Sequence, residues 1–527
     1  MDIKPNVHYV KGDDVIMGFV HSDTGERKMA NKALVFMLQG LTTKWKQPVT
    51  FYLTHTSNGS ELLVTYIHEV LDAAINIAKL DVVATICDMS TINVKCMKEL
   101  GSSLNRPFFV SNGKTIHTMF DPPHLLKCSA SLFRKHNVNL PVEVEGKHDM
   151  MTAKFKDIVS AYNIDKNNPL VFRTLYKLKD THLEPVMKFA MKVSVAAQVM
   201  SNTVGCYLYS LLSRGELEPR TLATATFVQQ MDELFDSFNG NQLKPSVKVL
   251  KCAITDDSPH LTYWEKAYGI VNSWKYERIN KKGHLMKGKP PSQIGWLTSL
   301  KAIRNIWLYV RSKGVTSLPP RRLNQDSLEN AFGTIRNGCG SSDHPTTCQF
   351  ISSLKTYIIN GMTSQIKGNC EDDNSSLLTN MRSFLDVPLP IREPLHTDQP
   401  LPNTSYHELF TDVAESVALG QSNVLSVAYV SGFIAKRVLS IVNCDICKIN
   451  LCLEQGLHNT FIWYKECNYE VQRFTYPSEN LTTFVGMSVT ALETFMEGYR
   501  GQKGLSQQAF CLYKPNCALR MVNLHHA

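Results

Sequence analysis

The pattern of apolar and polar positions over the first 140 residues predicts strands followed by a helix and another strand. Three short apolar or β-rich runs, separated by Asp, Gly, Lys and Pro, have the length of strands in a meander: 15–20, 33–38 and 49–53. Residues 61–79 then place apolar side chains at helical spacing, which predicts an amphipathic helix. The continuous apolar run 82–87 follows it and is typical of a strand covered on both faces.

This order of elements matches the RNase H fold, and in open sheets of that type chemistry gathers at the strand ends. Asp88 directly follows the buried run, so we expect either a metal ligand or an ordinary helix cap at this position. A further strand over 115–120 ends at Asp121, where two prolines predict the start of a helix. Asp121 or His124 should therefore face the same crevice as Asp88.

From about residue 145 to residue 300 the pattern becomes helical, with no convincing strand pairs, which predicts an α-rich insertion. Apolar side chains recur at helical spacing in 185–200, 221–239 and 296–312. A helix is predicted over 344–362, and residues 370–403, rich in Asp, Ser and Pro, read as a linker. The last part of the chain begins with two predicted helices, 405–418 and 424–441.

The stretch 323–336 carries the clearest candidate site. Leu328, Phe332 and Ile335 recur at helical spacing and predict one buried stripe. Asp326 and Glu329 are three residues apart and project together from a neighbouring face, an arrangement that offers oxygen ligands to a hard divalent cation such as Mg²⁺. The alternative is structural: Asn324 caps the helix, Asp326 complements its dipole and Glu329 is a solvated surface residue.

Composition and charge exclude few classes of protein. The chain has 527 residues, of which 43% are hydrophobic and 20% charged, and this is ordinary for a soluble globular protein of several domains. No apolar run reaches the roughly 18 residues that cross a bilayer, and no secretory signal is evident at the start, so we expect a cytosolic or nuclear protein without a membrane partner. The net charge of +9 permits a polyanionic partner without requiring one. The basic runs 281–289 and 319–322 fit either such a partner or exposed, solvated loops.

The 14 cysteines are scattered, which favours free thiols over a disulfide framework. Cys444 and Cys447 form one CxxC pair, followed by Cys452 and Cys467. No second pair stands at zinc-finger spacing, so the alternatives are a structural zinc site or plain buried cysteines, both favoured over redox chemistry.

Several segments together resemble the P element transposases and their THAP-domain relatives in animals. The segments that carry the resemblance follow one another in the family's order: Ile86-Cys87-Asp88, the run from Phe120 to Lys127, Ala196 to Ser201, Asp232 to Asn239, Leu323 to Asn330, Tyr429 to Ile434, and Tyr476 to Glu479. The Asn-Gln-Asp-x-Leu-Glu block at 324–329 is the most specific of them. The resemblance covers most of the chain.

The resemblance implies an α/β fold: an RNase H-like mixed sheet interrupted by an α-helical insertion, with a mainly α C-terminal region. The expected divisions are an RNase H-like first part at 1–140, a GTP-binding insertion at 141–300, a second RNase H-like part with the acidic helix at 301–370, a linker at 371–403 and a C-terminal domain at 404–527. The resemblance further implies a DNA transposase core that uses Mg²⁺ or Mn²⁺, acts on transposon ends and target DNA in the nucleus, and forms a homo-oligomer.

Carried over residue by residue, the resemblance assigns the fourth-strand catalytic acid to Asp88 and the late-helix acid to Glu329, both as metal ligands. Asp121 and His124 match the family's Asp-x-x-His motif and are expected to support the active site. Asp326 is expected to contact the metal ion that accompanies the nucleotide.

In the insertion, the segments that resemble the family's guanine nucleotide site contain Lys192, Val193, Ser201, Phe235, Asp236 and Asn239. Asp236 suits the guanine N1 and N2 donors, and Asn239 offers both a donor and an acceptor. Lys177 and Lys192 are candidates for phosphate contacts. Without the resemblance, Phe235 is a core residue and Asp236 an exposed acid.

The chain departs from the family at its first catalytic acid. That acid sits in an Asp-Glu-Met-Ser-type strand, and this chain starts within the strand at Met1, so the acid is expected before residue 1 and Asp2 is the nearest substitute. The family's zinc-coordinating DNA-binding domain is also not found ahead of Val15. We therefore expect a degenerate transposase core, with a non-catalytic, domesticated nuclear protein that binds DNA or protein, or regulates, as the alternative.

Overall fold

The computed structural model describes the chain with gaps, over residues 1–10, 15–20, 28–56, 59–144, 146–167, 173–184, 192–243, 248–278, 284–360, 376–377, 421–442, 444–453, 456–466 and 474–498. The chain divides into two units, each described below by itself. The first unit comprises Met1–His136, Val186–Ala197 and Gln230–Leu389, and the second comprises Asn137–Pro185, Gln198–Gln229 and Pro390–Ala527.

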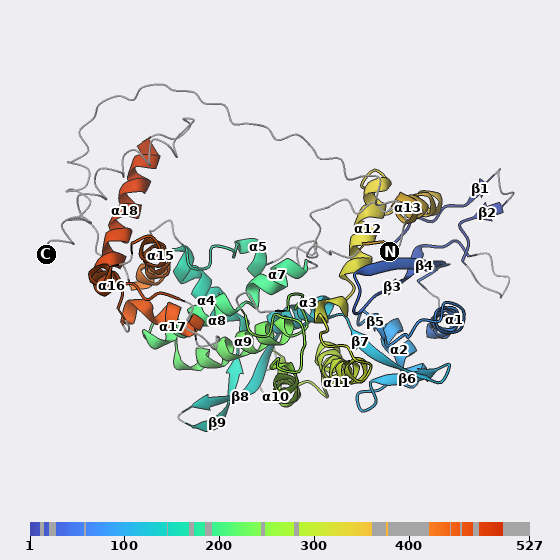
Figure 1. Cartoon of the computed structure of the whole chain (residues 1–527), viewed down its shortest axis with the longest axis horizontal. Coiled ribbons are helices and arrows are strands. Elements are labelled where there is room, and N and C mark those ends of the chain that lie inside the picture. The colour runs from blue at the N-terminus through green and yellow to red at the C-terminus, as the bar shows by residue number, and fades with distance from the viewer. Residues whose placement is uncertain are drawn as a thin grey trace. The chain divides into compact units, whose positions relative to one another are not determined.

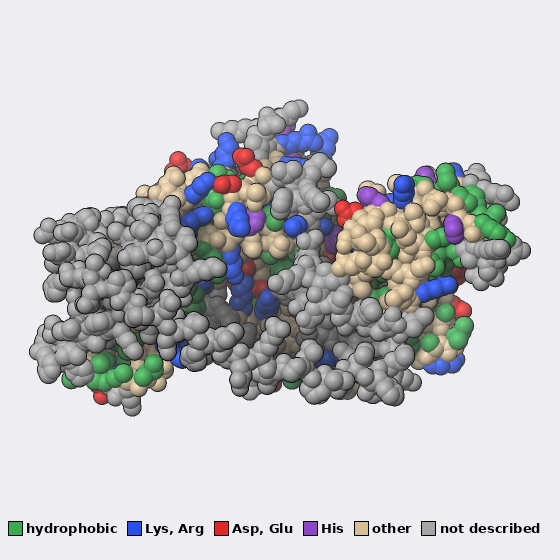
Figure 2. All heavy atoms as spheres, turned by 90° about the horizontal axis from the view of Figure 1, so that it is seen from above, with side chains coloured by type: hydrophobic (Ala, Val, Ile, Leu, Met, Phe, Trp, Pro, Cys, Tyr) green, Lys and Arg blue, Asp and Glu red, His purple; other side chains and the backbone are tan. Residues whose placement is uncertain are grey.

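The first unit contains a sheet in the order β11-β4-β3. Strands β3 (Lys32–Gln39) and β4 (Trp45–Thr54) pair antiparallel, and β11 (Ser376–Leu377) pairs parallel with β4. Beside them, β1 (His8–Val10) and β2 (Val15–Met17) form a small antiparallel ladder. Apolar side chains are exposed on and next to this ladder, as Figure 2 shows in green at the right-hand end: Val7, Tyr9, Ile16 and Met29.

A second sheet of the first unit has the order β5-β7-β6. Strand β5 (Ala84–Cys87) runs parallel to β7 (Lys114–Phe120), and β6 (Phe108–Ser111) runs antiparallel to β7. Since β7 is central, its side chains from Ile116 to Phe120 are all buried.

Helices cover these sheets. Helix α1 (Ser60–Asp72) continues as a π-helix (Ala73–Ile77) and packs with α2 (Thr91–Glu99) on the second sheet, in a core that includes Ile67, Met97, Phe109 and Ile116. Helices α12 (Asp326–Gly338) and α13 (Thr347–Asn360) lie side by side next to β3 and β4 (Figure 1), in a core that includes Val35, Phe332, Ile335 and Phe350.

The long helix α11 (Pro291–Ser312) crosses β7 and fixes helix α3 (Pro122–Lys135) against it. The Ser299 hydroxyl accepts a hydrogen bond from the Phe120 N–H at 3.0 Å, and the Trp296 indole donates to the Ser129 hydroxyl at 3.1 Å. Gly295 faces α3 so closely that a Cβ there would lie 2.4 Å from a Leu125 methyl carbon. Helix α10 (His260–Ser273) packs beside α11, and the short strand β10 (Lys275–Arg278) follows it.

The second unit begins with a hairpin of β8 (His136–Val144) and β9 (Lys147–Ala153). Its remaining elements are helical: α4 (Phe155–Lys166), α5 (Asp180–Leu183), α8 (Asn202–Ser213), α15 (Gln421–Leu439), α16 (Asp445–Leu451), α17 (Thr460–Glu466) and α18 (Glu479–Gly498). Helices α7 (Val193–Val199) and α9 (Leu222–Asp236) each contain residues of both units. No helix in the described ranges is long and apolar enough to span a bilayer.

Most predicted elements of the first part are confirmed. The strands expected at 33–38, 49–53, 82–87 and 115–120 correspond to β3, β4, β5 and β7, and the helix expected at 61–79 corresponds to α1 with its π-helical end. The strand expected at 15–20 is shorter, because β2 stops at Met17 and only an isolated bridge pairs Phe19 with Met29.

The helices expected at 221–239, 296–312, 344–362 and 424–441 are found as α9, α11, α13 and α15. The expectation of no strand pairs after residue 145 is wrong, because β9 pairs with β8. Residues 147–150 of β9 are exposed, so this strand lacks the apolar alternation that would have predicted it. The predicted helix 405–418, the first half of 185–200 and nearly all of the predicted linker lie outside the described residues.

Candidate active site at the start of helix α12

Asp121 links two elements that are far apart in the sequence. It follows β7 and caps α3, where one carboxylate oxygen, Oδ2, accepts a hydrogen bond from the His124 N–H at 3.0 Å. The other oxygen, Oδ1, accepts from the N–H of Gln325, the N-cap residue of α12, at 2.7 Å. The buried carboxylate therefore ties the end of β7 to the start of α12.

The pKa of Asp121 is raised to about 7, mainly because the group is buried and further because Asp326 and Glu329 are nearby. The two backbone N–H donors act in the opposite direction and favour the charged form. Since both oxygens are already occupied by backbone donors, Asp121 suits the predicted role of active-site support better than that of a metal ligand.

Asp88 stands just past the end of β5. Its Oδ1 accepts from the Ser90 N–H at 2.9 Å and from the Asn93 side-chain amide at 2.7 Å. Ser90, whose hydroxyl accepts from the Asn93 N–H, is the N-cap of α2, so the interpretation of Asp88 as a helix cap is wrong. Its second oxygen makes no hydrogen bond to any described residue, and Asp88 is held in one orientation with an oxygen still available.

Glu329 lies in the first turn of α12 and is half-buried. Within the described ranges its carboxylate makes no hydrogen bond and no ion pair. Asp326, one turn earlier, is buried and lies 3.7 Å from the Arg321 guanidinium. The Asp326 N–H donates to the Asn324 side chain at 3.1 Å, but the N-cap of α12 is Gln325, so the expectation that Asn324 caps the helix is wrong. Glu329 is not a fully solvated surface residue either.

The pKa of His124 depends on the charges of both candidate metal ligands, Asp88 and Glu329. Burial lowers its pKa, and the charge of Lys127 lowers it further, whereas the charges of Asp88 and Glu329 both raise it. The two carboxylates, which come from β5 and α12, therefore act on the same imidazole of α3. The fold thus gathers four of the predicted positions, Asp88, Asp121, His124 and Glu329, at one end of the β5–β7 pair.

Asp2 does not join this group. Its side chain is 62% exposed and lies 3.9 Å from the Lys32 ammonium. Ile3 packs into the core beneath α12, and because side chains alternate along an extended segment, Asp2 points to the opposite face. Among the described residues, no three His, Cys, Asp or Glu side chains are arranged as a set that could hold a metal ion. The expectation that Asp2 completes the set is not met.

In the predicted nucleotide segment, Asp236 ends α9 and is buried, contrary to the exposed acid expected from the residues alone. The Lys248 ammonium donates to Oδ2 of both Asp236 and Asp232. Burial, followed by the charge of Asp232, raises the pKa of Asp236 to about 6, and Lys248 opposes this shift. The sequence did not predict a role for Lys248, because no motif in the adjacent residues indicates an ion pair with Asp236, 12 residues earlier at the end of α9.

Asn239 is buried close after Asp236, and its carboxamide makes no hydrogen bond to any described residue. Phe235 is only half-buried, while Phe238 is the buried aromatic residue here and packs against Trp264 and Trp296. The Oδ1 atom of Asp236 likewise has no hydrogen bond within the described ranges. This segment therefore presents polar atoms that suit a ligand with both donors and acceptors.

The other predicted nucleotide contacts are spread over both units. Lys192 and Val193 are half-buried in the first unit. Lys177 and Ser201 belong to the second unit, where Lys177 is exposed with its ammonium 5.6 Å from the Tyr176 ring centre, and Ser201 caps α8. Each is described only within its own unit.

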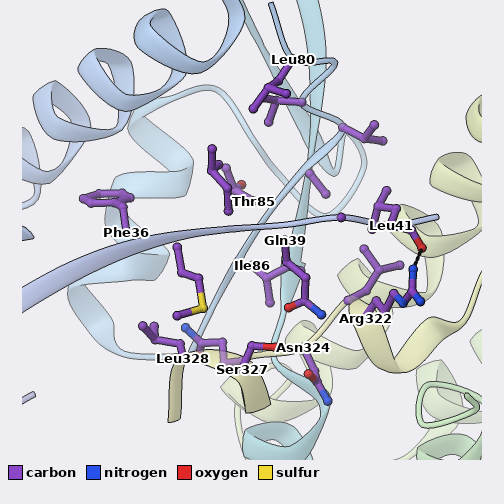
Figure 3. A pocket seen from close by; sticks show the side chains of 18 of the residues that line it. Phe36, Gln39, Leu41, Leu80, Thr85, Ile86, Arg322, Asn324, Ser327 and Leu328 are labelled. Atoms are coloured by element: carbon purple, nitrogen blue, oxygen red, sulfur yellow. Dashed lines mark hydrogen bonds between the residues drawn. The ribbon is translucent and has the colours of Figure 1, made fainter. Parts of the chain in front are cut away.

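Two of the remaining sequence expectations change. Arg322, from the basic run 319–322, is buried and donates to the Leu41 carbonyl at 2.8 Å (Figure 3), so it is neither an exposed solubilising residue nor placed for a polyanion.

Cys444 and Cys447 are free thiols that are only half-buried, so the alternative of plain buried cysteines is wrong. Part of the run 281–289 and Cys467 lie outside the described residues.

The order of strands and helices, with parallel β5 and β7 and an acidic helix that returns after a large insertion, defines an RNase H-like α/β class. Three family models match the chain: the TNP-like RNase H N-terminal domain over residues 1–101, the TNP-like GTP-binding insertion domain over 124–249, and the TNP-like RNase H C-terminal domain over 322–355. The chain therefore contains TNP-like RNase H and GTP-binding insertion domains, and it is homologous to the P element transposase of Drosophila.

The curated relative is the transposable element P transposase of Drosophila melanogaster, which is 29% identical over 353 residues. The match covers 66% of this chain and 44% of the relative, so the chain spans less than half of that protein's length. Among solved structures, the Drosophila P element transposase strand transfer complex matches with a TM-score of 0.56 and 23% identity, over 69% of this chain and 76% of the other. At that identity the structural match establishes the fold.

Proposed function

We propose that this protein is a transposase-type DNA-binding protein, with a P element-like core for Mg²⁺-dependent phosphodiester cleavage and strand transfer and with GTP as a cofactor. The observation that carries the proposal is the convergence of Asp88 and Glu329 on His124. Two half-buried carboxylates whose charges act on one imidazole, next to the start of α12, would supply oxygen ligands to a hard cation. The homology to a transposase supplies the class of substrate.

The carboxylates fit a divalent metal ion. Asp88 has one oxygen fixed by Ser90 and Asn93 and one oxygen without a hydrogen bond to the described residues, while the carboxylate of Glu329 makes none. A Mg²⁺ or Mn²⁺ ion bound there would supply charge stabilisation at a phosphodiester and an activated water or 3′-hydroxyl. Asp88 and Glu329 would hold the ion, and Asp121 would keep α12 at the distance from β5 that this requires.

His124 would act beside the ion, because burial and Lys127 keep its pKa low and its imidazole neutral near pH 7. A neutral imidazole can accept a proton or donate a hydrogen bond to a phosphate oxygen. Asp326, already paired with Arg321, is better suited to keep the first turn of α12 in place than to bind a metal ion directly.

GTP is proposed for the segment at the end of α9. Asp236 offers a carboxylate oxygen and Asn239 a carboxamide, both buried and both without a hydrogen bond from the described residues on those atoms. A guanine edge presents two N–H donors and a carbonyl acceptor, which such a pair can satisfy. Lys192 is the proposed phosphate contact in the first unit, whereas Lys177 and Ser201, which belong to the second unit, stay predictions from the resemblance.

A non-catalytic nuclear protein that binds DNA or protein is the second candidate. The observation that favours it is the exposed side chain of Asp2: among the described residues, no third His, Cys, Asp or Glu side chain joins Asp88 and Glu329 in a set that could hold a metal ion. With two carboxylates a single metal ion can bind, but the transition state of strand cleavage would lose much of its electrostatic stabilisation. A nuclear location and self-association are proposed for both candidates.

Mn²⁺ titration followed by electron paramagnetic resonance tests the metal site. Asp88→Asn and Glu329→Gln should each weaken binding roughly ten-fold or more, because each removes a charged ligand. Glu61→Gln, which changes an exposed acid in the first turn of α1, is the matched control and should bind like the parent. Equal Mn²⁺ affinity in all four proteins would refute the site.

Nicking of supercoiled DNA separates the two candidates. A core that retains activity should nick DNA with Mg²⁺ or Mn²⁺, and Asp88→Asn and Glu329→Gln should abolish the nicking. DNA binding without nicking, unchanged by either substitution, would instead establish the non-catalytic candidate.

A further inference from the structure

Lys248 bridges two carboxylates at the end of α9. Its ammonium donates to Oδ2 of Asp232 and to Oδ2 of Asp236, which lie one helical turn apart on the same side of the helix. Asp236 is buried, and the side chains of Asp232 and Lys248 are only 13% and 32% exposed, so solvent screens these contacts weakly. One cation therefore compensates two acids in a largely buried place.

The segment that carries Lys248 is fixed to the chain that leaves α9. The Ala253 N–H donates to the Gln242 carbonyl at 2.7 Å. Gly240 lies so close to Cys252 that a Cβ there would be 1.9 Å from the Cys252 carbonyl oxygen. Backbone contacts on the C-terminal side of Lys248 therefore bring the ammonium to the end of α9.

Asp236 has one oxygen engaged and one left for a ligand. Oδ2 accepts from Lys248, and Oδ1 makes no hydrogen bond within the described ranges. A like charge nearby favours a protonated carboxyl group, whereas a nearby cation favours the ionised form. Burial and then Asp232 raise the pKa of Asp236 to about 6, while Lys248 and, after it, Lys251 lower this pKa. Near pH 7 the ammonium therefore leaves Asp236 ionised, with Oδ1 as an acceptor.

The other titratable groups around Asp236 come from α9 and α10. The pKa of Glu233 is raised to about 7, mainly by burial, and the charge of Lys266 on α10 lowers it. Burial raises the pKa of Tyr263, also on α10, well above its ordinary value, so this phenol stays neutral. Lys266 acts on Glu233, and the cation that contacts Asp236 itself is Lys248.

The protonation state of Asp236 decides which purine edge it can bind. A guanine edge presents two donors, N1–H and the 2-amino group, and an ionised carboxylate can accept from both. An adenine edge presents the acceptor N1 beside the donor 6-amino group, and a protonated carboxyl group complements that pair. If Asp236 held a proton, it would therefore lose its preference for guanine.

We propose that Lys248 is a positioning residue that gives the site at Asp236 its selectivity for guanine over adenine nucleotides. Lys248 keeps Asp236 ionised beside Asp232 and engages Oδ2, so that Oδ1 is left for the ligand. Lys248 itself does not contact the nucleotide. The inference rests on the proposed binding of GTP at this segment, and it adds the residue that sets the selectivity.

Titrations of the full chain with fluorescent GTP and ATP analogues, from about pH 5.5 to about pH 8, test the proposal. In the parent, GTP affinity should fall as the pH drops through about 6, where Asp236 takes up a proton. Lys248→Met should move this midpoint up by about one pH unit or more, because the cation is lost. The same change should weaken GTP binding roughly three-fold or more at pH 7 and leave ATP binding equal or tighter.

Asp232→Asn should move the midpoint in the opposite direction, to lower pH, because it removes a like charge beside Asp236. A merely structural role of these side chains would not produce shifts of opposite sign. The phosphate groups of the nucleotides titrate alike in every variant, so the differences in midpoint report on the protein.

Two lysine variants serve as controls. Lys248→Arg retains the cation and should keep the parental midpoint and selectivity, and Lys275→Met, which changes an exposed lysine of β10, should bind like the parent. If the parent binds GTP, and Lys248→Met keeps both the midpoint and the preference over ATP, the role of Lys248 is overturned while GTP binding stands. If the parent binds neither nucleotide at any pH, GTP is refuted as the ligand and the proposal falls with it.

Discussion

The carboxylate of Asp121 accepts a hydrogen bond from the backbone N–H of Gln325, 204 residues further along the chain, at 2.7 Å. Its other oxygen caps α3 through the His124 N–H. One buried acid thus fixes the start of α3 and the start of α12, the helix that carries Glu329. The position of Glu329 relative to Asp88 depends on this connection, because Asp88 lies at the end of β5, which pairs with the strand that ends at Asp121.

Asp121→Ala should lower the free energy of unfolding by about 1–3 kcal/mol, because it leaves two backbone donors without their acceptor in a buried place. Asp121→Asn should cost less, since its carbonyl oxygen can still accept one of the two hydrogen bonds. Urea denaturation measures both, and Asp149→Asn, an exposed acid of β9, is the control that should stay within about 0.5 kcal/mol of the parent. An unchanged denaturation midpoint for Asp121→Ala would contradict the role of Asp121 in holding the starts of α3 and α12 together.

Gly295→Ala should destabilise the protein by about 1–3 kcal/mol, because the new Cβ would meet a Leu125 methyl carbon at 2.4 Å and the Met89 sulfur at 3.1 Å. Gly269→Ala in α10 is the matched helical control, since no atom lies within 4 Å of its Cβ position. That change should be neutral or stabilising by up to about 1 kcal/mol. Thermal unfolding of the pair measures the difference, and equal melting temperatures would show that α11 can move away from α3.

His260 should make stability depend on pH. It is fully buried between the Ser258 hydroxyl and the Leu250 carbonyl, and burial lowers its pKa to about 4 from an ordinary 6.5. Because the folded state disfavours the charged form, its contribution is present above pH 6.5 and is lost as pH falls from 6.5 towards 4. Urea unfolding at several pH values should show this slope in the parent and in His8→Gln, an exposed control, and a weaker slope in His260→Gln. If the free energy of unfolding of His260→Gln depends on pH as steeply as that of the parent, His260 is not the source of the pH dependence.

Asp236→Asn should weaken GTP binding roughly ten-fold or more, because a hydrogen bond to a charged acceptor contributes about 1.5–3 kcal/mol. A fluorescent GTP analogue measures the affinity by titration, and ATP tests the selectivity for guanine. Glu265→Gln, an exposed acid of α10 paired with Arg304, is the control and should bind like the parent. If Asp236→Asn folds normally and binds with parental affinity, the guanine contact is elsewhere.

The elements of the first part were predictable because their signals are local. The helical spacing of Leu328, Phe332 and Ile335 anticipated the buried side of α12, and the β-rich runs anticipated β3, β4, β5 and β7. The hairpin partner β9 was missed because its first four residues are exposed and carry no apolar alternation. A strand that is stabilised mainly by backbone hydrogen bonds to its partner strand carries little hydrophobic pattern in its own sequence.

Within the candidate site, the sequence by itself determined the chemistry: which acids follow strands, which acids share the first turn of α12, and which segments resemble the P element transposases. Only the tertiary structure decided how they are used. It made Ser90 rather than Asp88 the cap of α2, turned Asp2 away from α12, and paired Asp236 with Lys248. The reason is physical, since hydrophobic periodicity reports the side on which a residue is buried, whereas the partner of a carboxylate or a strand edge can come from a segment that lies far away in the sequence, as Gln325 does for Asp121 at a separation of 204 residues.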